Sequence, residues 1–502
     1  MATLIQHESR EAEFAPSAGK VITVPLIIRG KIIEESLITF PGRHGGVTFS
    51  TPDVRRYVDQ LPLSNPSALQ DFYTISLDEI MDFLEELGTR LDFRRNTYLQ
   101  ESFEMSMGAS GLTEPILRNM YEYALPRMFD RRVLEEVVER NIGRQYLEGW
   151  VPTPLVSGAT GEVRAFGARG IHVVPGNAPL AVGVTVIRCA VTRSDAIIKS
   201  PSNDPMTHAA VIRTMIDLDA NHPITRHLTV GYWKGGDEAV EKALYHPKNV
   251  EKIVAWGGMG SIKHIARYLQ PGIDLITLEP KFSSSIIGRD TFSDEATMRK
   301  VAHLLALDFA GVNQEGCANS RVVYADTGTD DAGIETVNRF GTYVYEAMLR
   351  LPPHISTKPK DFDVELASEL DALRVDDTFF RVIGGSEREG AIIVSQFPEP
   401  VDFSRSLGSR VANIVPMNGV ETAIRSVNSY TQTIGIFPDT LKDSIRDRLS
   451  LHGAQRIVSL GFAVSAMMAL PQDGMEPLRR MCRWISGETG SVDNTKSLIA
   501  NQ

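Results

Sequence analysis

The sequence is poor in cysteine and in positive charge. Only three of its 502 residues are cysteines, and they lie far apart, at positions 189, 317 and 482. An odd, widely spaced set of cysteines does not indicate a disulfide framework, and it suits a reducing cytoplasm in which a free thiol persists. The net charge of −11 argues against a nucleic-acid-binding protein, although local Arg and Lys can still hold an anionic substrate.

Long apolar runs and a targeting segment are also missing. The longest apolar stretches, Ala181–Val191 and Val464–Leu470, are too short to cross a bilayer, and Arg188 interrupts the first. Met1–Phe14 lacks the basic-then-apolar order of a signal peptide. No set of His, Cys and Asp has zinc-ligand spacing. We therefore expect a cytoplasmic protein with no membrane span and no metal site.

The composition, with 42% hydrophobic and 23% charged residues, is that of a soluble globular protein, and the chain is too long for one core. Residues 20–40 predict one hairpin, and the Ser76–Glu79 capping box begins a helical region. From residue 171, short apolar strands alternate with helices, which is typical of βαβ units and a parallel sheet. The predicted strands are Ile171–Val174, Ala196–Ile198, Leu228–Val230, Lys252–Ala255 and Leu275–Leu278. The helices predicted between them are Leu180–Ala190, Thr207–Asp217, Asp237–Leu244 and Ser261–Leu269, and a second α/β unit follows.

The segment Asn313–Arg321 contains the cysteine with the most reactive setting. The apolar run Val301–Ala310 predicts a helix that ends at Gly311, and Val322–Tyr324 predicts a strand. Cys317 then lies in a tight, glycine-flanked connection, where we expect backbone N–H groups to lower the thiol pKa and supply one oxyanion donor. The alternative is a small buried cysteine, but the neighbours are small or polar. The other two cysteines are expected to be packing residues.

Four further loops follow predicted strands, and ligands bind beyond the carboxyl ends of strands in such sheets. Each loop also has an ordinary structural interpretation: a turn, an edge lysine, a strand–helix turn, or a strand-end glutamate paired with a lysine. The loops are Pro175-Gly176-Asn177-Ala178-Pro179, Lys199-Ser200-Pro201-Ser202, Trp256-Gly257-Gly258-Met259-Gly260-Ser261 and Leu278-Glu279-Pro280-Lys281.

Asn313-Gln314-x-x-Cys317, followed by Ser320-Arg321, resembles the nucleophile segment of the aldehyde dehydrogenase superfamily. Trp256-Gly-Gly and Pro471–Met475 resemble, within it, the long-chain acyl-CoA reductases of bacterial luminescence. The resemblance implies an α/β fold with a Rossmann-type cofactor domain, an α/β catalytic domain and a small oligomerisation-type extension. We expect a scaffold and NADP(H)-binding domain over residues 1–285, a catalytic domain over 286–472, and a tail over 473–502 that packs on or bridges subunits.

The resemblance also implies roles for the loop residues. Asn177 would hold the oxyanion, and Lys199 would hold the adenosine ribose. Ser202 stands where the superfamily has a glutamate, so a 2′-phosphate is not repelled and NADP(H) is expected. Glu279 matches a glutamate that activates water, but the glycines after it are missing, so a proton shuttle and an ion pair with Lys281 both remain open. The pyrophosphate turn would consist of Trp256, Gly257, Gly258 and Ser261.

The function implied is NADPH-dependent reduction of a fatty acyl thioester to the aldehyde through an acyl-enzyme on Cys317. The substrate would be an acyl-CoA or an acyl-carrier thioester. An acyl-transferring enzyme is a candidate partner, and family members assemble as homo-oligomers. Two alternatives remain: an NAD(P)-dependent aldehyde dehydrogenase that forms a free acid with Glu279 as base, and a non-catalytic structural homologue.

Overall fold

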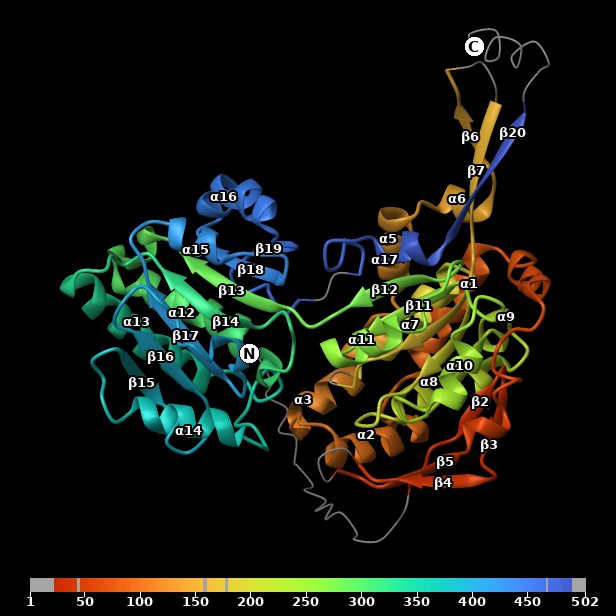
Figure 1. Ribbon diagram of the computed structural model, residues 1–502, viewed down its shortest axis with the longest axis horizontal. Coiled ribbons are helices and arrows are strands. Elements are labelled where there is room, and N and C mark those ends of the chain that lie inside the picture. Colours follow the sequence, from red (N-terminus) through yellow and green to blue (C-terminus); the bar gives the residue numbers. More distant parts are fainter. Residues whose placement is uncertain (1–21, 43–45, 157–159, 177–178, 466–467, 490–502) are drawn as a thin grey trace, which may run out of the picture.

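The computed structural model describes residues 22–42, 46–156, 160–176, 179–465 and 468–489. Two seven-stranded sheets, each covered by helices, form two lobes, and a narrow three-stranded sheet projects from one of them (Figure 1). Among the described residues, no helix is both long and apolar enough to cross a membrane.

The first large sheet has five parallel strands extended at one edge by an antiparallel pair. All the strands and helices predicted for residues 171–278 are present, with ends moved by at most a few residues. In spatial order the strands are β12 (Asp274–Leu278), β11 (Lys252–Trp256), β8 (Arg169–Val173), β9 (Asp195–Lys199), β10 (Leu228–Gly231), β2 (Leu26–Ile28) and β3 (Lys31–Ile33). The helices between them are α7 (Ala181–Val191), α8 (Thr207–Asp219), α9 (Pro223–Arg226), α10 (Glu238–Leu244) and α11 (Met259–Ala266).

The N-terminal hairpin is shorter than predicted. β2 and β3 pair around Arg29-Gly30, whose φ angles of 49° and 82° suit a tight hairpin turn. The chain leaves the sheet after Ile33, and Ser36 adopts a left-handed conformation with φ 55°. The prediction of one hairpin over residues 20–40 is therefore wrong at its second half. A separate small sheet follows, formed by β1 (Ile22–Thr23), β5 (Phe49–Pro52) and β4 (Leu37–Phe40).

The second large sheet is parallel except at one edge, where its first two strands run antiparallel. In spatial order it contains β15 (Phe380–Gly384), β16 (Ala391–Ser395), β17 (Val411–Pro416), β14 (Ser320–Ala325), β13 (Phe282–Ile287), β18 (Thr431–Phe437) and β19 (Arg456–Ser459). Its helices are α12 (Glu295–Ala310), α13 (Asp331–Leu349), α14 (Val364–Leu373), α15 (Glu421–Ser426) and α16 (Asp439–His452). Since β13 belongs wholly to this sheet, the domain boundary predicted between residues 285 and 286 falls inside a strand.

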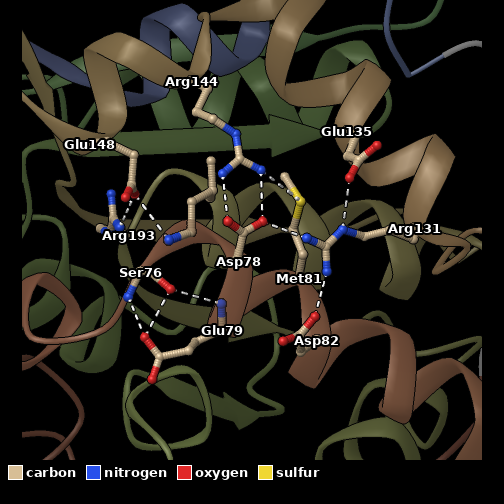
Figure 2. Close-up of polar contacts among 11 residues, drawn as sticks. Ser76, Asp78, Glu79, Met81, Asp82, Arg131, Glu135, Arg144, Glu148 and Arg193 are labelled. Carbon is tan, nitrogen blue, oxygen red and sulfur yellow. Dashed lines mark hydrogen bonds and ion pairs between the residues drawn. The ribbon is translucent and has the colours of Figure 1, made fainter.

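The helical region beside the first sheet begins with the predicted capping box. Ser76 accepts from the Glu79 backbone N–H at 3.1 Å, and its own N–H donates to the Glu79 carboxylate at 2.7 Å (Figure 2). On the same helix, Asp78 binds Arg131 and Arg144, which joins three helices. The helices are α1 (Leu77–Arg90), α2 (Thr97–Ala109), α3 (Glu114–Asn119), α4 (Leu125–Arg127), α5 (Arg131–Asn141) and α6 (Arg144–Glu148).

The narrow projecting sheet joins distant parts of the chain. β7 (Thr160–Phe166) lies between β6 (Val151–Pro154) and β20 (Arg483–Thr489), and both neighbours run antiparallel to it. The short helix α17 (Pro477–Met481) leads into β20. The segment after residue 472 thus completes a sheet begun more than 300 residues earlier.

Candidate active site

The candidate site lies where the two large sheets meet. Parallel strands bring Lys199, Trp256 and Leu278 to one carboxyl edge of the first sheet. Along the chain, β12 at this edge is followed by a three-residue connection, Glu279-Pro280-Lys281, and then by β13 of the second sheet. Because Cys317 precedes β14, which pairs with β13, the thiol lies at the amino edge of the second sheet, next to this connection.

The turn that presents Cys317 is strained. Helix α12 ends at Gly311 as predicted, but Gly311 has φ −52°. The left-handed conformations fall instead on Val312, Asn313 and Gln314, with φ of 53°, 52° and 65°. Each such residue costs about 1–3 kcal/mol, and a β-branched valine is especially unusual there. Such a turn persists only where the surrounding structure holds it in place.

Buried amide side chains hold the turn. Gln314 donates to the Val411 carbonyl and accepts from the Val411 N–H, both at 2.9 Å, which fixes it to β17. Asn319 accepts from the Gly316 N–H at 2.9 Å and donates to the carbonyls of Gly311 at 2.9 Å and Asp308 at 3.1 Å. These bonds satisfy backbone groups that the turn leaves without helix or sheet partners.

The three cysteines differ in the exposure of the whole residue. Of the three cysteines, Cys317 is exposed, whereas Cys189 and Cys482 are buried, as predicted for packing residues. The Cys317 carbonyl accepts from Ser283 Oγ at 2.7 Å, and the same Oγ accepts from the Thr433 N–H at 3.2 Å. Ser283 therefore fixes the backbone of Cys317 to β18.

The prediction of a lowered thiol pKa is wrong. Protein atoms around the sulfur reduce its hydration and raise the pKa of Cys317, because burial disfavours the charged form. A hydrogen bond from Gln432 and the positive charge of Arg321 oppose this rise, whereas the negative charge of Asp473 adds to it. The backbone N–H of Cys317, in the glycine-flanked turn, lowers the thiol pKa by less than the loss of solvent raises it.

Asn177, the predicted oxyanion donor, lies outside the described residues. The loop that leads to it is joined to the lysine loop, since Asn203 Nδ2 donates to the Gly176 carbonyl at 2.9 Å. A Cβ atom at position 176 would lie 1.8 Å from Asn203 Oδ1, so any other residue would require the Asn203 side chain to move.

Lys199 ends β9, and its ammonium lies over the rings of Tyr232, at 5.8 Å, and Trp233, at 5.6 Å. Burial lowers the pKa of Lys199 to about 8, and the carboxylate of Glu241 partly opposes this. Such a lysine gains its full charge when an anion binds beside it.

Ser202 is half-buried in the loop after Lys199. The nearest acid in sequence, Asp204, is buried and accepts hydrogen bonds from the hydroxyl and backbone N–H of Thr207. Burial raises the pKa of Asp204 to about 6. This carboxylate faces the protein core, so the loop offers a hydroxyl rather than an acidic group.

The glycine-rich turn connects β11 to α11. Trp256 ends the strand and is half-buried, and the guanidinium carbon of Arg188 lies 5.8 Å from the centre of its indole ring. Gly257 and Gly258 precede the helix, and Ser261 is exposed in its first turn. A Cβ atom added to Gly258 would meet nothing within 4 Å. The backbone of this turn is therefore open to a ligand at the N-terminus of the helix.

Glu279 is ion-paired with Lys281, with 3.3 Å between Oε1 and Nζ. This is the ion pair that the sequence left open beside a proton-shuttle role. Burial raises the pKa of Glu279, but Thr277 and Lys281 outweigh it, and the net pKa is lowered. A carboxylate held in its charged form by a buried lysine is a weak base near neutral pH. Within the described part of the chain, no three His, Cys, Asp or Glu side chains are grouped as metal ligands.

Sequence reasoning missed Gln432 and Asp473. Gln432 Nε2 donates to Asp473 Oδ1 at 2.7 Å, and both side chains influence the thiol. Two local signals point to Asp473: the resemblance of Pro471–Met475 to the luminescence reductases, and Asp473-Gly474, a pair typical of tight hairpin turns.

A family model described as "Acyl-CoA reductase (LuxC)" matches residues 72–484. The long-chain acyl-protein thioester reductase of Photorhabdus laumondii subsp. laumondii is 28% identical over 453 residues, which cover 87% of this chain and 89% of that protein. Long-chain acyl-protein thioester reductase 2 of Photobacterium leiognathi is 26% identical over 434 residues, covering 84% of this chain and 85% of that protein.

Solved structures show the same architecture. Aldehyde dehydrogenase 21 from Physcomitrella patens, in complex with succinate, has a TM-score of 0.73 at 13% identity, covering 94% of this chain and 99% of that one. The NADP-dependent glyceraldehyde-3-phosphate dehydrogenase of Bacillus halodurans C-125, complexed with NADP, has a TM-score of 0.70 at 14% identity, covering 93% and 99%. The aldehyde-dehydrogenase-like fold predicted from the sequence is confirmed.

Proposed function

Since the chain belongs to the acyl-CoA reductase (LuxC) family, we propose that it reduces a fatty acyl thioester to the aldehyde, using NADPH and an acyl-enzyme formed on Cys317. The observation that carries this proposal is the exposed residue Cys317 on a turn fixed by buried amides, beside the carboxyl edge of the first sheet. A thiol suits the reaction because it attacks well as a thiolate and leaves well when the aldehyde forms.

The chain's own groups account for acyl transfer. The Cys317 thiolate attacks the thioester carbonyl, a new S–C bond forms, and the S–C bond to the donor breaks, so that the donor thiolate leaves and takes a proton. The Cys317 backbone N–H and Asn177 are proposed to hold the oxyanion. One such donor is worth about 3 kcal/mol in the transition state. Arg321, whose positive charge lowers the thiol pKa, favours the thiolate.

The residues present fit NADP(H). Lys199 supplies a cation whose charge a bound anion would stabilise, Ser202 supplies a hydroxyl where a carboxylate would repel a 2′-phosphate, and the open turn at Gly258 leaves room for a pyrophosphate. Trp256, Gly257 and Ser261 complete the proposed cofactor contact. When bound, NADPH supplies the hydride that converts the acyl group to the aldehyde, and Cys317 is then released.

The acyl donor is a thioester of CoA or of a protein. The family description names acyl-CoA, whereas the curated relatives are named for acyl-protein thioesters. The chemistry at Cys317 is the same for both, because only the departing thiol differs. Oxidation of NADPH measured with acyl-CoA and with acyl-carrier-protein thioesters of rising chain length separates the donors.

The decisive experiment replaces Cys317 by Ala. The variant should form no acyl-enzyme from a radiolabelled acyl thioester and should oxidise no NADPH, yet it should bind NADPH as the parent does. Reductase turnover by Cys317→Ala would refute the proposal. Rapid oxidation of aldehyde with NADP⁺ in the absence of a thiol acceptor would instead support the alternative of a free-acid-forming dehydrogenase.

A further inference from the structure

A turn from the C-terminal part of the chain reaches the nucleophile. Gln472 and Met475 exchange backbone hydrogen bonds of 2.9 and 3.0 Å across Asp473 and Gly474. Both central residues are left-handed, with φ of 54° and 74°. Asp-Gly is a favoured pair for such a turn, so the Asp473 carboxylate projects from a well-defined backbone.

The turn touches both lobes. On the cofactor side, Arg188 Nη2 donates to Gln472 Oε1 at 2.7 Å. Arg188 lies on α7 and is buried, and within the described residues its Nε and Nη1 have no partner. On the other side, Asp473 accepts from Gln432 of β18. The turn therefore connects the two sheets at the point where the thiol lies.

Gln432 is 7% exposed and lies on β18, directly before Thr433. Its neighbour Thr433 is tied through Ser283 to the carbonyl of Cys317. The amide nitrogen of Gln432 carries two hydrogens, and Asp473 takes one of them at 2.7 Å. The amide also donates to the thiol and thereby lowers its pKa, whereas the charge of Asp473 raises it.

Several charges face Asp473 from the elements around it. Burial raises the pKa of Asp473, and the negative charge of Glu279 adds to this rise. The hydrogen bond from Gln432 and the positive charges of Lys281 and Arg188 oppose it. The negative charge of Asp473 raises the pKa of Cys317, whereas the positive charge of Arg321 lowers it.

We propose that Asp473 and Gln432 are a positioning pair for Cys317, in which Gln432 donates towards the sulfur and Asp473 fixes the Gln432 amide and places a negative charge nearby. The proposal rests on Cys317 being the nucleophile of the proposed reaction. Asp473 holds back thiolate formation in the free enzyme, and Gln432 supports the thiolate once it forms. A thiolate of higher basicity is also the stronger nucleophile towards an acyl donor.

The test is the pH profile of Cys317 alkylation by iodoacetamide in the full-length protein, where the other two cysteines are buried. Asp473→Asn keeps the turn, because Asn tolerates left-handed backbone and precedes glycine well in hairpins. It removes one negative charge, so the midpoint of the alkylation rate against pH should fall by about one pH unit. Below that midpoint, alkylation should become up to about tenfold faster. Gln432→Met keeps the length but not the donor, and its midpoint should rise by about half a unit.

Opposite shifts in the two variants support the pair, since a merely loosened structure would move both profiles in one direction. Unchanged profiles, or shifts of the same sign, overturn it. Asp447→Asn, at a carboxylate that is 97% exposed, is the matched control and should leave the midpoint unchanged. The readout needs neither acyl donor nor NADPH, so failure of the pair is distinguishable from failure of the reductase assignment, which Cys317→Ala tests.

Discussion

The loops at the edges of the two sheets are built in opposite ways. The nucleophile turn has three consecutive left-handed non-glycine residues, held by buried amide side chains. The glycine-rich turn after β11 has open space around Gly258 and an exposed Ser261. A reacting atom must be fixed to within a fraction of an ångström, whereas a bound phosphate needs room and free N–H groups. Under the proposed roles of the two turns, strain accompanies the chemistry and openness accompanies binding.

The largest expected effect comes from releasing the strained turn. Asn319→Ala removes three hydrogen bonds from the segment around Cys317, so acyl-enzyme formation should fall by about a hundredfold. The free energy of unfolding in urea should fall by about 1–3 kcal/mol, because buried backbone groups lose their partners. NADPH binding should not change. Asn428→Ala, at an exposed asparagine that bonds the Tyr430 N–H, is the control and should retain acylation.

Filling the open turn should have the next largest effect. Gly258→Val adds atoms where a Cβ meets nothing, so the protein should fold normally while the Kd for NADPH rises about 30-fold, or about 2 kcal/mol. Alkylation of Cys317 should proceed at the parental rate. Gly149→Val, at another open glycine, between α6 and β6, should leave the Kd unchanged. An unaffected Kd in Gly258→Val would remove this turn from the cofactor site.

The charge of Lys199 gives a smaller effect that depends on pH. Its pKa of about 8 means that the amine is mainly charged below pH 8 and mainly neutral above it. If the charged form holds the cofactor phosphate, the Kd for NADPH should rise by up to about tenfold between pH 7 and pH 9. Isothermal titration at several pH values measures this, and Lys199→Met should bind weakly with a flat profile. A flat profile in the parent protein would contradict a phosphate contact.

The smallest effect is expected at Glu279. Since its carboxylate is paired with Lys281 and its pKa is lowered, Glu279→Gln should change acyl-thioester reduction by less than about threefold. The Tm should fall slightly, because buried Lys281 loses its counter-charge. A block after acylation, seen as acyl-enzyme that accumulates in the presence of NADPH, would show that Glu279 handles a proton and would restore it to the catalytic set.

Much of the fold could be predicted because its signals are local. The capping box at Ser76, the strands from β8 to β12 and the end of α12 at Gly311 all depend on residues within a few positions of one another. The hairpin at residues 20–40 was over-extended, since the break at Ser36 has no glycine or proline to mark it. The family resemblance drawn from the nucleophile segment is confirmed by the match over residues 72–484.

By itself, the sequence determined which residues reach the two sheet edges, because strand order along a βαβ chain brings carboxyl ends together. It also determined that Cys317 lies on a short connection between a helix and a strand. Only the tertiary structure decided the direction of the thiol pKa and the arrival of Gln432 and Asp473, which are more than 100 positions away in the chain. Burial and charge act through space, so residues far apart in sequence set the chemistry of a sulfur whose position its neighbours had already fixed.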